Sequence, residues 1–148
     1  MNALESIGRW GLRWAMGAAL AAALIGCSGT LRYAPKGTPR APDADAYIEA
    51  LVSQPNMMTQ VSIKVEHLAP PDRLVAGSTN YVVWARRDDG APWARVGSLK
   101  YDNDSRKGEL YGASVPETSF ELVISAERQA APAGPSADVV VAQKVGAM

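Results

Sequence analysis

Short apolar segments alternate with clusters of proline, glycine and aspartate from about residue 44 onward. The first clear segment carries Val61, Ile63 and Val65 in alternation with polar residues, which predicts a strand with one buried and one solvated face. Residues 68–71 (LAPP) end this segment, because proline cannot donate a hydrogen bond to a strand ladder. The regular spacing of such segments predicts an all-β domain.

A central strand is predicted at residues 80–87 (NYVVWARR), which carry apolar side chains on both faces. Residues 88–90 (DDG) supply a tight turn, because glycine adopts positive φ without penalty. Residues 94–101 are expected to return antiparallel to the central strand. After a turn at residues 102–105, residues 107–113 are expected to form the next strand, so that two successive hairpins make a meander.

The clearest alternation lies in residues 119–127 (SFELVISAE), with Val123 as its one exception. The predicted inward residues are Phe120, Leu122, Ile124 and Ala126, and the predicted outward residues are Glu121, Ser125 and Glu127. Residues 129–137 contain two prolines and are predicted to form a loop. Residues 139–141 (VVV) are predicted to open a last strand.

Residues 45–53 (DAYIEALVS) fit two structures. We favour a strand, and the alternative is a short helix capped by Asp43 or Asp45. With this strand, seven short strands separated by turn signals predict a small antiparallel β-sandwich of the immunoglobulin type over residues 44–148. A domain of about 100 residues can bury a workable core without disulfides.

The beginning of the chain has a different pattern. Arg9 and Arg13 precede an uncharged apolar run at residues 14–26, which is the layout of a signal peptide. A hydrocarbon core about 30 Å thick needs roughly 20 helical residues, so this run is too short to span a bilayer comfortably. We therefore expect residues 1–26 to form a signal helix that is removed on export.

Residues 24–27 (LIGC) resemble the lipobox of bacterial lipoproteins, in which small residues precede an obligatory cysteine. The resemblance implies cleavage between Gly26 and Cys27 and attachment of lipid to Cys27, whose thiolate can accept a diacylglyceryl group as a thioether. The acyl chains would then anchor the protein to a membrane. The alternative is an ordinary secretory signal or a buried apolar helix, with Cys27 an incidental thiol.

Three further features of the sequence bear on export and anchoring. Cys27 is the only cysteine, so the mature chain would have no disulfide. Residues 27–43 are rich in proline, glycine and small polar residues, which predicts a lipid-anchored flexible tether. Ser28, a residue other than aspartate after the cysteine, implies the periplasmic face of the outer membrane in a host with two membranes, and otherwise the outer face of the cell membrane.

Charge and composition give no case for nucleic acid as a partner, because 15 basic side chains balance 15 acidic ones.

His67, the only histidine, shares the alternation face of Val61, Ile63 and Val65, so we expect it to be a structural residue bonded to backbone. With one histidine and one cysteine, a transition-metal site has too few ligands, and no metal or other cofactor is expected. Residues 102–105 (DNDS) depart from a calcium loop after Ser105 and predict a solvated turn.

Four aromatic residues of the predicted meander suggest a glycan-stacking surface, namely Trp84, Trp93, Tyr101 and Tyr111. Trp84 lies in the middle of the central strand and is predicted to be core. Trp93 follows a proline near a turn and is the best candidate for contact with a ligand. Simple packing over a hairpin end is the alternative for Trp93.

Several short motifs between residues 68 and 135 resemble the extracytoplasmic domain of anti-sigma-K factors. They are residues 68–71 (LAPP), 81–84 (YVVW), 89–90 (DG), Gly97, 120–127 (FELVISAE) and 132–135 (PAGP). The resemblance covers roughly residues 61–145 and implies a small β-sandwich outside the membrane. The sigma-binding segment and the membrane span of those factors have no counterpart here, so the resemblance does not extend to anti-sigma activity.

Two classes of function remain. The first is a lipid-anchored envelope protein whose non-catalytic β-sandwich contacts another envelope protein or polymer, with a carbohydrate-binding module that uses exposed aromatics as a variant. The second is a small hydrolase that uses His67 and nearby acids, although no Gly-x-Ser-x-Gly motif occurs in the chain.

Overall fold

The computed structural model describes residues 29–146, so the predicted signal peptide, Gly26 and Cys27 lie outside the described residues. The strands are β1 (Gly29–Tyr33), β2 (Asp45–Ser53), β3 (Met58–Glu66), β4 (Asn80–Arg86), β5 (Ala94–Ser98), β6 (Lys100–Asp102), β7 (Lys107–Val115), β8 (Phe120–Glu127) and β9 (Val139–Val145), and a short helix, α1 (Pro71–Leu74), precedes β4. Within residues 29–146, no helix is long and apolar enough to cross a bilayer.

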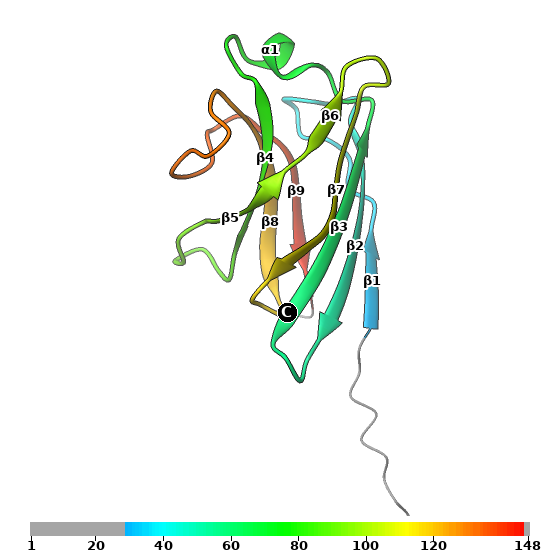
Figure 1. Ribbon diagram of the computed structural model, residues 1–148, viewed down its shortest axis with the longest axis vertical. Helices are drawn as coiled ribbons and strands as arrows, with labels where there is room; N and C mark the ends of the chain where they lie inside the picture. Colours follow the sequence, from blue (N-terminus) through cyan, green and yellow to red (C-terminus); the bar gives the residue numbers. More distant parts are fainter. Residues whose placement is uncertain (1–28, 147–148) are drawn as a thin grey trace, which may run out of the picture.

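The strands form two packed antiparallel sheets, which confirms the predicted β-sandwich (Figure 1). One sheet has five strands in the order β1-β2-β3-β7-β6, and the other has four in the order β5-β4-β8-β9. The described residues thus contain nine strands rather than the expected seven. Residues 45–53 form a strand and not a capped helix, and β4 is a central strand as predicted.

The core lies between the two sheets. The predicted inward residues of β3 and β8 are all buried there, and Tyr81, Val83 and Ala85 of β4 join them. The other face of β4 carries Val82 and Trp84, which form a second apolar cluster with Val123. This cluster explains why Val123 breaks the alternation of β8, because both faces of that strand are covered.

The expected tether is wrong, because residues 29–33 form an edge strand of the five-stranded sheet. β1 pairs antiparallel with β2, from Gly29 opposite Val52 to Tyr33 opposite Ile48. Leu31 and Tyr33 pack against the core, and the phenol oxygen of Tyr33 accepts a hydrogen bond from the Gly146 N–H (3.0 Å). The domain therefore includes β1, which lies before the expected start at residue 44.

Residues 34–44 are also part of the domain, because they connect β1 to β2 by way of the opposite sheet. The Thr38 N–H donates to the Val140 carbonyl (2.9 Å), and the Thr38 hydroxyl donates to the Val139 carbonyl (2.6 Å). Ala41 and Ala44 are buried. The prolines and glycines of this segment shape a packed turn rather than a flexible linker.

The predicted single strand at residues 94–101 is divided between the two sheets, so the expected meander is wrong. β5 pairs with β4 in the four-stranded sheet, and β6 pairs with β7 in the five-stranded sheet. Leu99, between them, is buried and donates its N–H to the Tyr81 carbonyl (2.9 Å). The chain passes from one sheet to the other at this residue, and each sheet holds one of the two hairpins.

Candidate functional site

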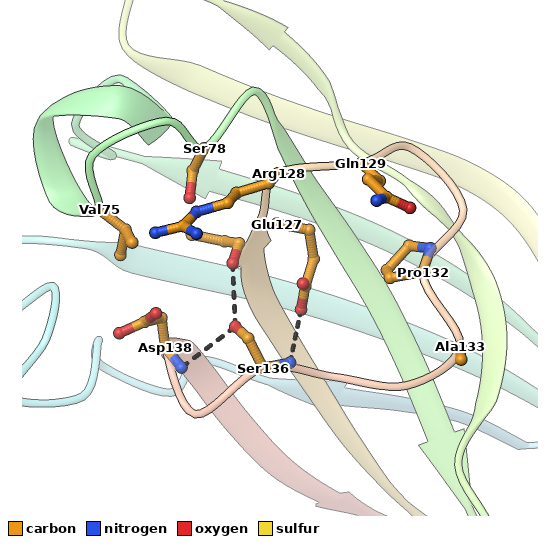
Figure 2. Close-up of a pocket in the computed structure, with 10 residues that line it drawn as sticks. Val75, Ser78, Glu127, Arg128, Gln129, Pro132, Ala133, Ser136 and Asp138 are labelled. Atoms are coloured by element: carbon orange, nitrogen blue, oxygen red, sulfur yellow. Dashed lines mark hydrogen bonds between the residues drawn. The ribbon is translucent and has the colours of Figure 1, made fainter.

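A polar pocket of about 340 Å³ lies near the end of the sandwich that carries α1, away from the end where β1 begins (Figure 1). It lies between the α1–β4 connection and the β8–β9 loop, residues 128–138. The lining residues with polar side chains are Ser78, Glu127, Arg128, Gln129, Ser136 and Asp138 (Figure 2). Two segments that are far apart in the sequence therefore contribute hydrogen-bonding groups to one concave surface.

Buried hydrogen bonds shape one wall of the pocket. The Trp84 indole N–H donates to the Ser125 hydroxyl (2.9 Å), which donates in turn to Oε1 of Glu127 (2.6 Å). The same carboxylate oxygen accepts the Ser136 N–H (2.7 Å), as Figure 2 shows. Ser125 and Glu127 lie on the outward face of β8, as predicted, but both are buried there. Alternation assigns a side chain to a face, but here the β8–β9 loop covers that face.

Ser136 fixes the loop over the strand. Its hydroxyl donates to the Ala126 carbonyl (3.0 Å) and accepts the Asp138 N–H (3.2 Å), and Figure 2 shows both bonds. The Asp138 carboxylate forms an ion pair with Arg40 of the β1–β2 connection. Because Glu127 and Asp138 already have donors, neither carboxylate is an unengaged charge in the pocket.

Two donors in the pocket have no acceptor within residues 29–146. The Ser78 hydroxyl is buried, only 2% of the residue being exposed, and its oxygen has no hydrogen-bond partner in that range. Arg128 forms no ion pair with any of the described side chains, and its guanidinium lies on the same side of the pocket as Ser78 and Val75 (Figure 2). The cost of a buried polar group without a partner applies to Ser78, whereas Arg128 is exposed. The pocket is therefore suited to a ligand group that accepts hydrogen bonds, such as a carboxylate.

Substitution of Ser125 tests how much the buried hydrogen bonds of this pocket wall contribute to the stability of the domain. Ser125→Ala leaves the buried Trp84 N–H without its acceptor, and we expect it to lower the free energy of unfolding by about 1–3 kcal/mol. Urea denaturation followed by circular dichroism measures the change. Ser114 on β7 is exposed, so Ser114→Ala should change stability by less than about 0.5 kcal/mol. Equal stability of the two variants would show that the buried hydrogen bonds do not hold this wall.

His67 lies at the surface, so its predicted placement on the inward face with a backbone partner is wrong. β3 ends at Glu66, and His67 has a left-handed φ of 55°, which turns its side chain out of the strand alternation. Its Nδ1 lies 3.1 Å from Oδ2 of Asp45, and the other carboxylate oxygen of Asp45, Oδ1, accepts a hydrogen bond from Lys36. Hydrogen bonds from Lys36 and His67 hold the pKa of the Asp45 carboxyl below its usual value. Within the described residues, no serine hydroxyl bonds to the His67 ring.

The four aromatic residues do not share one exposed face. Trp84 is buried, as predicted, and the half-buried Tyr101 donates its hydroxyl to the Leu68 carbonyl (2.6 Å). Trp93 is also half-buried, beside the Trp84 cluster, and the Arg86 guanidinium lies 4.4 Å from the centre of its ring. One face of the Trp93 ring is thus occupied by a cation, while Tyr111 is 65% exposed on β7 of the other sheet.

The predicted turn at residues 102–105 is confirmed. The Asp102 carboxylate accepts hydrogen bonds from the Ser105 hydroxyl (2.8 Å) and the Asp104 N–H (3.0 Å), and these bonds lower the pKa of Asp102. Across residues 29–146, no group of three or more histidine, cysteine, aspartate or glutamate side chains is placed to hold a metal ion.

Comparison with known proteins adds no relative to this picture. No protein-family model matches the chain, and no curated protein matches it. The resemblance to the outer domain of anti-sigma-K factors therefore stays a prediction from short motifs. Two features of this chain bear on its function, namely the signal-like pattern of residues 1–27 and the geometry of the sandwich.

Proposed function

We propose that this chain is a lipid-anchored envelope protein whose β-sandwich is a non-catalytic module that contacts another envelope protein or polymer. The observation that carries the proposal is the place of Cys27 in the chain. The lipobox-like cysteine stands two residues before β1, while the polar pocket lies toward the opposite end of the sandwich (Figure 1). Lipid on Cys27 would hold one end at the membrane and leave the pocket facing away from it.

The length of the strands supports an anchor at one end of the sandwich and a binding site at the other. β2 and β3 each have nine residues, and a strand rises about 3.3 Å per residue, so the sandwich is roughly 30 Å long. A pocket at the far end would stand clear of the lipid headgroups and remain accessible to a partner in the envelope. A carboxylate or another acceptor on that partner would meet the Arg128 guanidinium and the Ser78 hydroxyl.

The two alternative functions have less support from the geometry. A carbohydrate-binding surface needs rings on one exposed face, whereas Trp93 is half covered by Arg86 and Tyr111 lies on the other sheet. A serine hydrolase needs a hydroxyl beside the histidine, and the side-chain partner of His67 is Asp45. We therefore favour a module that contacts another envelope protein or polymer through the pocket over a carbohydrate-binding module and over a hydrolase.

The anchor is tested by the mass of the native protein purified in detergent. We expect a mature chain that begins at Cys27 and carries a diacylglyceryl group together with a further acyl chain on its amino group. A chain that begins at Met1 with a titratable thiol would overturn the anchor, and a chain cut elsewhere with no lipid would indicate an ordinary secretory signal.

Contact through the pocket is tested with a photo-crosslinking amino acid placed in living cells at Gln129. Gln129 is exposed and lines the pocket, and Gln60, exposed on β3, is the matched control. We expect a discrete crosslinked product from position 129 and none from position 60. Adding Arg128→Gln should lower the yield about tenfold, because a charge-assisted hydrogen bond is lost. Equal products from both positions, or none from position 129, would contradict contact at the pocket.

A further inference from the structure

The end of the sandwich where β1 begins also carries the β2–β3 hairpin. Gly29 pairs with Val52, and Val52 pairs in turn with Thr59, so the start of β1 lies beside the strand ends that flank the hairpin turn. Figure 1 shows the start of β1 and this turn at the same end of the molecule. An anchor attached to the chain just before Gly29 would therefore also keep this hairpin close to the anchor.

The hairpin is uncharged and carries exposed apolar side chains on both sides of a polar turn, residues 53–56. Leu51, Met57 and Met58 are 45%, 59% and 40% exposed, and they are three of the five large hydrophobic residues exposed within residues 29–146. Between Glu49 and Lys64 the chain has no charged residue. Exposed apolar side chains with no charge beside them enter a lipid interface without the cost of dehydrating an ion.

Hydrogen bonds in the turn fix how the methionines are presented. The Met57 N–H donates to the Gln54 carbonyl (3.2 Å), and the Asn56 amide donates to the Ser53 hydroxyl (3.0 Å). Met57 itself has a left-handed φ of 50°. Just beyond the hairpin, Glu117 accepts the Thr59 hydroxyl through its carbonyl (2.7 Å), and its carboxylate forms an ion pair with Arg87 (2.9 Å). The charges of Glu117 and Arg87 thus neutralise each other.

The distance to the lipid is short. Two residues of chain span at most about 7 Å, so a lipid-modified Cys27 would lie that close to Gly29. Acyl chains in the bilayer hold such a cysteine at the level of the headgroups. The expected flexible tether would have allowed the domain to move far from the surface, but β1 leaves no room for one.

We propose that the β2–β3 hairpin, with Leu51, Met57 and Met58 exposed on it, is a membrane-contacting surface that enters the lipid interface beside the anchored Cys27. The proposal rests on the proposed function, because it takes the anchor at Cys27 as given. It adds a second point of contact with the bilayer, and two contacts restrict the tilt of the domain where one anchor alone would not. The sandwich then stands with its strands directed away from the membrane.

The test uses the full lipidated protein in vesicles of phosphatidylethanolamine and phosphatidylglycerol. Met57→Cys is labelled with an environment-sensitive fluorophore on its thiol, the Cys27 sulfur being blocked by lipid, and Gln129→Cys is the matched control at the pocket. We expect blue-shifted emission from position 57 and at least about threefold stronger quenching there by doxyl-labelled lipids than at position 129. Met58→Cys serves as a second probe should Met57→Cys fold poorly.

Each other outcome overturns a different statement. Lipid on Cys27 with equal, water-like emission from positions 57 and 129 would overturn the inference and leave the anchor intact. Absence of lipid on Cys27, read by mass, would overturn the proposed function instead. A blue shift at position 57 that follows protein density in the vesicle and resists the lipid quencher would show that a second copy of the chain, and not the bilayer, covers the hairpin.

Discussion

Replacing Cys27 with serine is expected to abolish fatty-acid labelling of the protein and to leave the precursor uncleaved. A serine hydroxyl is a much weaker nucleophile than a thiolate, so it cannot accept the diacylglyceryl group. The effect on anchoring is large, because each methylene buried in the bilayer contributes about 0.8 kcal/mol and two or three chains are lost at once. Growth with a radioactive fatty acid, followed by purification and electrophoresis, measures the label.

Ser28→Ala is the matched control for the cysteine variant, because it changes the neighbouring residue and keeps the thiol. Its label should equal that of the wild type. Label that persists in Cys27→Ser would mean that the acyl chains are attached elsewhere and that the lipobox interpretation is wrong.

A second large effect is expected for Gly37→Ala, in the segment that the sequence presents as a tether. A β-carbon on Gly37 would lie 1.8 Å from the Ala41 carbonyl oxygen, a backbone atom that cannot rotate away. The Gly37 N–H also donates to the Ala44 carbonyl (2.7 Å), so a shift of the backbone would break this bond. We expect the free energy of unfolding to fall by about 3 kcal/mol, or the melting temperature by roughly 10 °C.

Two other glycines control for the loss of glycine itself. A β-carbon on Gly29 or Gly134 meets no atom within 4 Å, so Gly29→Ala and Gly134→Ala should change stability by less than about 0.5 kcal/mol. Thermal unfolding followed by circular dichroism compares the three variants. If Gly37→Ala were as stable as the other two, residues 34–44 would be a loose linker after all.

The strands with long alternation could be predicted from sequence, and the shorter elements could not. β3 and β8 have eight or nine residues, which is enough for a two-residue period to stand out. β1 has five residues, only Leu31 and Tyr33 of which pack against the core, and proline and glycine follow it. Its place depends on pairing with β2, a contact that no local pattern encodes. The passage between the sheets at Leu99 did leave a signal, because the apolar positions change from the alternation face of Ala94 and Val96 to that of Leu99 and Tyr101.

The polar pocket was beyond sequence reasoning for a related reason. Ser78, Glu127 and Asp138 are separated by many residues and come together only when α1, β8 and β9 are in place. The one available signal was the pair of polar residues Ser125 and Glu127 near the end of a mostly apolar strand. A polar residue in such a strand has either solvent or a buried partner, and only the covering loop decides between the two.

The position of β1 also decides how the sandwich would bear load between a lipid anchor and a bound partner. Force on Cys27 would act along β1 from its first residue, while a partner at the pocket would pull from the other end of the molecule. Antiparallel ladder bonds run perpendicular to the strands, so this direction shears the β1–β2 ladder instead of unzipping it. Its five residue pairs would resist the pull together, and the attachment would yield only when the whole strand slides.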